Sequence, residues 1–492
     1  MYLSMPPILA VTICVAFIVY LFWVDIRRPD SPSPALSVPL AWMFLAGSRY
    51  VSSWLGLAPA FVSADDYAEG SPIDRAAFSA LIVAGIIILA RRKIDWAQLL
   101  IKNKWIVLYL LYCLASMAWA NEPFLLMKRW AKDLGNPIMA LVLLTERRPY
   151  EAVGVVLRRF TFLALPLSLL FIKYYPELGR AYHQDGSPMY TGVGHQKNDL
   201  GLMCLVAGIY LSWELLQRRT TRPALTRQEK FVAVILATLF VWLLQMSDSQ
   251  TSVACLVAVV LLLLLGRVPF IARKPAAILD ALSFAVLTIW LVNEVLDVKE
   301  LALSSMGRNP TLTGRTEIWT VVESFEVNPL VGVGYMSFWS GPRLAELWRL
   351  IGQQITQAHN GYLEQYLNLG YIGVAFIVAI MLSGLLSVRR HLKVDPAAGV
   401  LRLSFIMAAT LYNYTEASFY GLNNMWVLLL LGCIEVPPQP QPLKPSVVKG
   451  NAGVRYRRGP SPLQAENSHI PHRRGPTPKG LDVQGSPPPP PT

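Results

Sequence analysis

A histidine and an asparagine stand side by side in a chain that is otherwise mostly apolar. His359 and Asn360 come just before an apolar stretch that contains Gly370 and Gly373, so they fall at the edge of a membrane span. An imidazole can accept a hydroxyl proton near neutral pH. A single histidine at a membrane edge is more often structural than catalytic. The adjacent Asn360, and Glu364 one helical turn further on, favour the catalytic interpretation.

An arginine precedes this histidine in the same extramembrane stretch. Apolar residues at helical spacing predict a helix over residues 313–326, with Arg315 in its first turn. A cation at that position is unfavourable with the helix dipole. The arrangement makes sense if a phosphate binds to the guanidinium and to the free backbone N–H groups of the first turn. The alternative is a surface arginine that caps nothing.

A second amphipathic helix is predicted between the arginine and the histidine. Leucine, isoleucine and tryptophan residues form one stripe over residues 342–355. Such a helix can lie along the membrane surface or pack on the outer face of the protein itself. In either position it would roof a cavity.

The elements that must position these residues are membrane helices. The chain has 492 residues, of which 54% are hydrophobic and only 15% charged, whereas a soluble protein usually has about 25% charged residues. About thirteen apolar runs of roughly 17–20 residues are long enough to cross a bilayer. They start near Ile8, Val38, Ala76, Trp105, Lys132, Val155, Leu200, Phe231, Thr251, Ala277, Tyr371, Val400 and Leu422. The expected fold is an all-α transmembrane bundle with a long extracytoplasmic loop that contains short helices.

The basic residues gather in alternate loops, so the net charge of +13 indicates a membrane rather than a nucleic acid as partner. The positive-inside rule places these loops in the cytoplasm. They are residues 91–104, 147–148, 218–230, 267–274 and 389–393. Segments 175–198 and 297–358 then face the outside, as does the N-terminus.

Three regions are predicted. Residues 1–104 form N-terminal transmembrane helices, and residues 105–436 form the transmembrane core with a catalytic loop at about 297–370. Residues 437–492 are rich in proline and arginine and are expected to be a disordered cytoplasmic tail. The arginines of this tail either rest on anionic lipid or are simply solvated.

Several short motifs resemble the bacterial O-antigen ligase/polymerase family. They occur in family order between about residues 105 and 430. The matching segments are 116–119 with Arg129, 194–201, 247–252, Gly314-Arg315 with Trp319, 328–335, and Ala358-His359-Asn360 through Glu364 to Gly373. The chain departs from the family pattern at Gln196, where a histidine is common, and at Gln250, where a basic residue is common.

The resemblance implies that the protein lies in the bacterial cytoplasmic (inner) membrane, with its outer side in the periplasm. It also implies roles for individual residues. Arg315 would hold the pyrophosphate of an undecaprenyl-pyrophosphate-linked sugar donor, and His359 would deprotonate or orient the attacking hydroxyl. Lys197 and Asn198 would form a second phosphate or sugar contact.

Further candidates for binding the substrate are Arg308, Arg129, Asn360 and Glu364. Either Arg308 or Arg129 could be a second phosphate clamp, although Arg129 could instead anchor the membrane interface. Glu364 would orient His359 or bind a neighbouring backbone group.

No metal or other cofactor is expected. Neither predicted outside loop carries an Asp-x-Asp pair or a His/Asp cluster with ligand spacing. ATP is not expected outside the cytoplasmic membrane, so a transferase there needs an activated donor such as a lipid pyrophosphate. Arginine suits the departing phosphate because its planar fork matches phosphate oxygens.

Three activities remain open. The favoured one is a glycosyltransferase that polymerises lipid-linked repeats for exopolysaccharide or O-antigen. The second is an O-antigen ligase that transfers polysaccharide to lipid A core, and the third is a flippase. Transporters usually place ionisable residues near mid-membrane, whereas the candidates here lie at outer span ends. The expected partners are the lipid-linked donor, a sugar or lipid-linked acceptor, the bilayer and other polysaccharide assembly proteins.

Overall fold

Helices of very different length make up the described part of the chain. The computed structural model describes residues 5–27, 33–57, 71–182, 186–221, 226–282 and 315–437. Within these residues, the strands are β1 (Arg180–Tyr182) and β2 (Pro188–Tyr190), which pair antiparallel; the remaining regular structure is helical. The predicted helical class is therefore confirmed for the described residues. The predicted tail falls outside them from residue 438 onward.

Among the described residues, six helices are long and apolar enough to cross a membrane. They are α1 (Pro7–Ile26), α5 (Pro72–Ala90), α10 (Pro149–Tyr174), α12 (Lys197–Thr221), α13 (Arg227–Met246) and α20 (Gly361–His391). A seventh span results if α6 (Trp96–Lys102) is counted with α7 (Lys104–Ala115) and η2 (Ser116–Trp119), across a bend of 84°.

The predicted number of about thirteen spans is not confirmed. Several of the predicted runs form helices shorter than the roughly 20 residues that a straight span needs. These are η1 (Pro34–Leu36) with α2 (Ser37–Gly47), α9 (Gly135–Leu144), α14 (Gln250–Leu265) and α22 (Asn424–Cys433). The run near Ala277 continues past residue 282, outside the described residues.

The long helices divide into a central and a peripheral group. Of the 18 most apolar consecutive residues of α10, 78% are buried, against 17% in α5 and in α13. The central helices α10, α12, α14 and α21 (Pro396–Thr415) pack in series, and α21 also contacts α20 and α22. The peripheral helices leave their apolar side chains exposed, as helices that face lipid do.

Ion pairs join several of the basic loops at one end of the bundle. Glu435, after α22, binds Lys102 at 2.9 Å and Arg390 at 2.7 Å. Arg389 lies 3.3 Å from Asp280. These contacts bring together loops that the positive-inside rule predicts on one side of the membrane. Which side that is remains a prediction.

α20 is broken at Gly370, which has φ 63° and ψ −167°. The segment from Pro329 to Gly334 fills the break. Tyr371 N donates to Pro329 O at 2.8 Å and Gly334 N donates to Asn368 O at 2.8 Å, so the segment satisfies backbone groups that the helix leaves open. A Cβ on Gly370 would lie 2.2 Å from the Leu330 backbone. Gly370 therefore interrupts a helix that already starts at Gly361.

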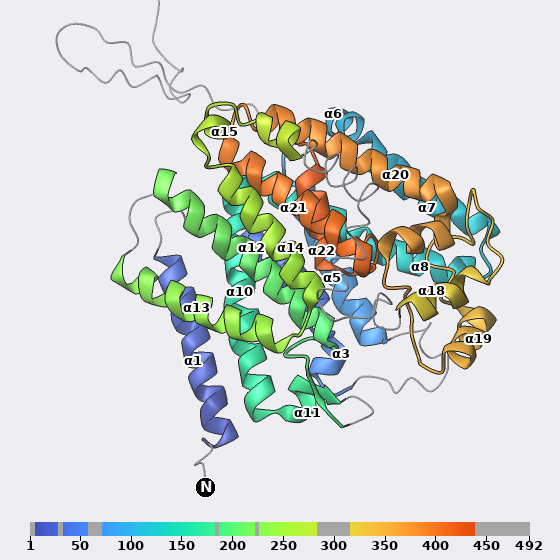
Figure 1. Cartoon of the computed structure of the whole chain (residues 1–492), viewed down its shortest axis with the longest axis horizontal. Helices are drawn as coiled ribbons and strands as arrows, with labels where there is room; N and C mark the ends of the chain where they lie inside the picture. The colour runs from blue at the N-terminus through green and yellow to red at the C-terminus, as the bar shows by residue number, and fades with distance from the viewer. Residues whose placement is uncertain are drawn as a thin grey trace, which may run out of the picture. The chain divides into compact units, whose positions relative to one another are not determined.

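The segment 315–360, which we call the cap, has a small apolar core of its own. The two predicted amphipathic helices form as α18 (Arg315–Glu323) and α19 (Gly341–Ile351). Figure 1 shows them together, near α8 (Pro123–Asp133) and away from α15 (Pro269–Arg273). Leu344 and Leu347 of α19 are fully buried. They belong to one buried apolar cluster with Val322, Phe338, Trp339, Ala358 and Leu367. Of the two predicted positions for α19, the structure therefore shows packing on the protein itself.

Two further short helices, α3 (Val51–Trp54) and α11 (Pro176–Gly179), complete the described elements. In sequence, α11 lies between α10 and β1, within the region predicted to be periplasmic.

Candidate functional site

A buried glutamate joins three of the predicted site residues. Glu416 follows the last residue of α21 and is 4% exposed. One carboxylate oxygen, Oε1, accepts hydrogen bonds from Arg315 Nη2 at 2.7 Å and from Asn198 Nδ2 at 2.8 Å. The other, Oε2, lies 3.0 Å from His359 Nδ1. Side chains from three separate parts of the chain therefore meet at one carboxylate.

The backbone around His359 is fixed on both sides. The residue has φ 50°, in the left-handed region that residues with a Cβ seldom adopt. Before it, Ala358 O accepts from Trp319 Nε1 at 2.8 Å. After it, Asn360 Oδ1 accepts from Tyr362 N and Leu363 N and so caps α20. The unusual backbone is held by contacts from α18 and α20, and strain of this kind is common at functional sites.

The contact with Glu416 determines which nitrogen of His359 is available for chemistry. An ionised carboxylate only accepts hydrogen bonds, so Nδ1 must carry the proton that it shares with Glu416. The second ring nitrogen, Nε2, then has the lone pair and can accept a proton from a hydroxyl group. The side chain of His359 is 20% exposed, so the ring is accessible from outside.

Arg315, predicted in the first turn of a helix over residues 313–326, is the first residue of α18 and pairs with Glu416. Its ion pair with Glu416 compensates a charge that would be costly to bury by itself. A guanidinium group has five N–H donors, and the pair with Glu416 uses Nη2. Arg315 can thus bind the carboxylate and present other donors to a phosphate.

Lys197 and Asn198 begin α12 next to this cluster. Asn198 contacts Glu416, whereas Lys197 Nζ lies 3.4 Å from Asp248 Oδ2 in a pair whose acidic member is 68% exposed. An exposed pair of this kind contributes little stability. Lys197 can therefore exchange Asp248 for an anionic ligand at small cost.

Glu364 is completely buried, and its carboxylate accepts hydrogen bonds from uncharged donors. Its carboxylate accepts from the indole Nε1 of Trp339 at 2.8 Å, the hydroxyl of Tyr420 at 2.9 Å and the backbone N of Ala358 at 2.5 Å. Asn368 Nδ2 donates as well, at 3.2 Å. Of the two predicted roles, contact with a neighbouring backbone group is the one observed. In this structure the side chain has no exposed surface for a substrate.

The remaining candidates lie elsewhere. Arg129 of α8 donates from Nη1 to Met336 O at 2.9 Å and so supports the cap. Nearby, Asp133 accepts from the hydroxyl of Tyr335 at 2.6 Å, and burial raises the pKa of the Asp133 carboxyl. Asn360 acts as a helix cap. Arg308 lies outside the described residues.

No group of three or more His, Cys, Asp or Glu side chains that could hold a metal occurs in the part of the chain that the structure describes. The positively charged side chains that the structure places near the site are Arg315 and Lys197.

Sequence reasoning missed Glu416. It stands alone between the two last apolar runs, 57 residues after His359 in the sequence. The available signal was its position, because an acidic residue at the end of a membrane span is rare and commonly functional.

The fold and the site together define a class of protein. It is a helical membrane protein in which a histidine and an arginine contact a buried carboxylate outside the membrane spans. Residues 231–378 match the family model described as O-Antigen ligase. The exopolysaccharide production protein ExoQ of Rhizobium meliloti (strain 1021) is 25% identical over 292 residues, which cover 57% of this chain and 63% of that protein. The resemblance to the O-antigen ligase/polymerase family that the motifs predict is thereby confirmed. The matched part spans less than two thirds of ExoQ.

Proposed function

We propose that the chain is a membrane glycosyltransferase that joins sugar repeats carried on undecaprenyl pyrophosphate. The observation that supports this most directly is the shared carboxylate of Glu416, which brings His359 and Arg315 together. A general base beside a cation for the leaving group is what glycosyl transfer from a lipid pyrophosphate requires.

The base in this proposal is His359. Its Nε2 takes the proton of the acceptor hydroxyl as the hydroxyl oxygen bonds to the anomeric carbon of the donor. Glu416 keeps the ring in the required tautomer through Nδ1 and stabilises the imidazolium ion that forms. An orienting carboxylate behind a histidine is a recurrent arrangement for activating a hydroxyl nucleophile.

The leaving group is the lipid pyrophosphate. When its bond to the anomeric carbon breaks, the electron pair remains on a phosphate oxygen, and the charge there must be stabilised. Arg315 and Lys197 supply positive charge on the same side as His359. The N-terminus of α12, which starts at Lys197, adds backbone N–H groups of the kind that bind phosphate.

We favour polymerisation over ligation. The similarity to an exopolysaccharide production protein supports the exopolysaccharide branch, whereas the family model carries the name of the ligase. An O-antigen ligase acting on lipid A core is the second candidate, since the same base and cation would serve it. We propose further that the site faces the periplasm and that the basic loops face the cytoplasm.

The test uses a strain that lacks the gene for this chain and receives the wild type, His359→Ala, Arg315→Ala or a control. The control is Arg349→Ala, because Arg349 lies in the cap on α19 and forms an exposed pair with Glu346. Lipid-linked sugars and surface polymer are measured in each strain.

Each outcome identifies one activity. Loss of polymerisation leaves single repeats on the lipid carrier. Loss of ligation leaves full-length polymer on the carrier and none on lipid A core. Repeats trapped on the cytoplasmic face would indicate a flippase instead. Normal polymer in both His359→Ala and Arg315→Ala would contradict the proposed site.

A further inference from the structure

The segment 247–252, which joins α13 to α14, contributes no residue to the mechanism proposed above, yet it borders the site on two sides. On one side, Asp248 Oδ2 lies 3.4 Å from Lys197 Nζ at the start of α12. On the other, the hydroxyl oxygen of Thr251 lies 2.7 Å from that of Thr415, the last residue of α21 before the buried carboxylate. The segment therefore lies between a cation and the carboxylate of the site.

Close packing holds Asp248 beside Lys197. A Cβ on Gly201 of α12 would lie 2.5 Å from the Cβ of Ser249, so α12 and α14 approach each other closely near their N-terminal ends. Ser249 Oγ accepts a hydrogen bond from Ser252 N and caps α14. Asp248 has φ 46°, in the left-handed region that aspartate and asparagine enter more readily than other residues with a Cβ. The backbone of Asp248 is thus fixed, whereas its side chain is 68% exposed.

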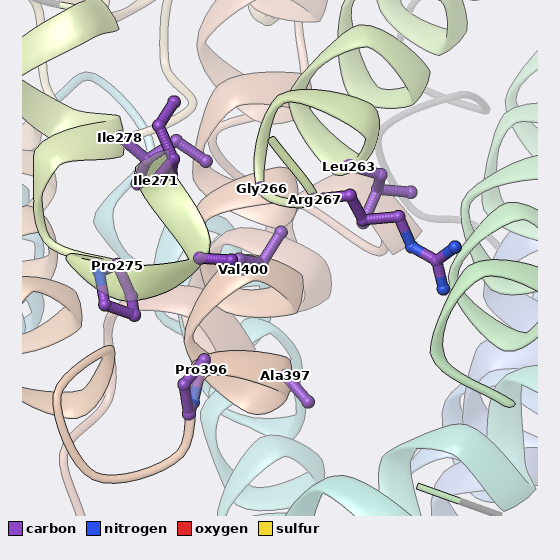
Figure 2. A pocket seen from close by; sticks show the side chains of 10 residues that line it. Leu263, Gly266, Arg267, Ile271, Pro275, Ile278, Pro396, Ala397 and Val400 are labelled. Atoms are coloured by element: carbon purple, nitrogen blue, oxygen red, sulfur yellow. The ribbon is translucent and has the colours of Figure 1, made fainter. Parts of the chain in front are cut away.

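The opposite end of α14 borders a different kind of surface. A pocket of about 300 Å³ lies there, between α14, α15 and α21. Its lining is apolar apart from Arg267, and Figure 2 shows that the guanidinium group of Arg267 points away from Ile271 and Ile278. The end of α14 that presents a charged side chain to the site is therefore the one that follows Asp248.

The two cations of the site differ in how tightly they are paired. The carboxylate that pairs with Arg315 is 6% exposed, whereas the carboxylate that pairs with Lys197 is 68% exposed. A buried pair is costly to break because it leaves a charge without compensation. An exposed pair separates at little cost, since water solvates both charges. Lys197 is therefore the cation that can change partners during a reaction.

We propose that Asp248 is an exchangeable counter-ion that competes with the donor's pyrophosphate for Lys197. A pyrophosphate carries more negative charge than one carboxylate, so it displaces Asp248 when the donor binds. After transfer, Asp248 pairs with the ammonium group again and helps the lipid pyrophosphate to leave. Asp248 then sets the affinity for the donor and for the product without touching the reacting atoms. This role rests on the proposed function, in which Lys197 binds the leaving group.

The experiment measures binding of farnesyl pyrophosphate, a short prenyl pyrophosphate, and of inorganic pyrophosphate by isothermal titration calorimetry. The purified full-length chain is used in a neutral detergent at low salt. The variants are Asp248→Asn, Lys197→Met and the double variant. Asparagine also enters the left-handed region readily, so Asp248→Asn removes the charge and keeps the backbone. The matched control is Glu346→Gln, which removes a carboxylate from the exposed pair with Arg349 in the cap.

We expect Asp248→Asn to bind both ligands about two- to fivefold more tightly than the wild type, the range that an exposed ion pair can supply. Glu346→Gln should bind as the wild type does. In the Lys197→Met background the Asp248 substitution should have little effect, because the two residues act through one contact.

Two outcomes would overturn the role of Asp248 while leaving the proposed function in place. One is equal affinity of Asp248→Asn and the wild type, and the other is an equal gain with and without Lys197. If Lys197→Met binds both ligands as tightly as the wild type, Lys197 does not belong to the donor site, and the role of Asp248 fails with it. A wild type that binds neither ligand would contradict the proposed pyrophosphate site itself.

Discussion

Two buried carboxylates, Glu416 and Glu364, contact the segment around His359 in different ways. Glu416 binds ionisable and polar side chains that are themselves partly exposed, namely Arg315, His359 and Asn198. Glu364 binds only neutral donors, among them Trp339, and is completely buried. The partners of Glu416 can still exchange protons or bind a ligand. The carboxylate oxygens of Glu364 instead accept hydrogen bonds that hold neighbouring segments together. We therefore expect the exposure of a buried acid's partners, rather than burial alone, to distinguish a functional acid from a structural one.

The largest effect is expected for Glu416→Gln. The amide presents a donor to Arg315, Asn198 or His359, so the ring of His359 no longer keeps the required tautomer. We expect transfer from a lipid-pyrophosphate donor to slow by on the order of 10³-fold, about 4 kcal/mol in the activation barrier. Single-turnover transfer by purified protein measures this. Glu346→Gln, in an exposed pair of the cap, should transfer at the wild-type rate, and a Glu416→Gln variant within tenfold of wild type would remove the distinction between the two carboxylates.

The next largest effect is expected for Gly370→Ala, in the same helix as Glu364. Gly370→Ala would place a Cβ at 2.2 Å from the Leu330 backbone and at φ 63°. We expect a loss of about 2–5 kcal/mol in the free energy of unfolding, from strain and overlap together. Gly352 has φ 73° but open space around it, so Gly352→Ala should lose only about 1 kcal/mol. Denaturation of both variants in detergent tests this; equal losses would mean that the docked segment does not stabilise the break.

Glu364→Gln should affect stability more than chemistry. One acceptor oxygen becomes a donor, so at least one of the groups around it, such as Ala358 N or the Tyr420 hydroxyl, loses its partner. We expect a cost of about 1–3 kcal/mol in the free energy of unfolding. The folded variant should retain transfer to within about tenfold, with an unchanged KM for the donor. A rate loss as large as that of Glu416→Gln, without a loss of stability, would show that Glu364 belongs to the reacting groups.

The smallest effect is expected for Lys197→Met. Its partner Asp248 is largely exposed, so the free energy of unfolding should change by less than about 1 kcal/mol. If Lys197 binds the pyrophosphate, the KM for the donor should rise severalfold while stability is kept, and high salt should reduce the difference between variant and wild type. An unchanged KM at low salt would exclude Lys197 from the donor site.

Local pattern predicted what depends on local sequence. The apolar stripes of α18 and α19 predicted both helices, and Arg315 fell at the start of α18 as expected. The motifs around His359 predicted the residue but not its partner, because Glu416 reaches it through the packing of α21 against α20. The break at Gly370 escaped prediction for the same reason: its backbone groups are satisfied by a segment some forty residues earlier in the sequence. The predicted number of about thirteen spans is not confirmed: six helices of the described residues are long enough to cross a membrane, because hydropathy does not detect where an apolar helix ends.

The break in α20 also sets how much of this helix can span lipid. At 1.5 Å per residue, the whole of Gly361–His391 would be about 46 Å long, well beyond a hydrocarbon core of about 30 Å. The part after the break, Tyr371–His391, is about 32 Å long and matches that thickness. The first two turns of α20 therefore need not fit the thickness of the hydrocarbon core, and they can move with the cap. A thicker or thinner bilayer would then tilt the second part of α20 and leave the distance between His359 and Glu416 unchanged.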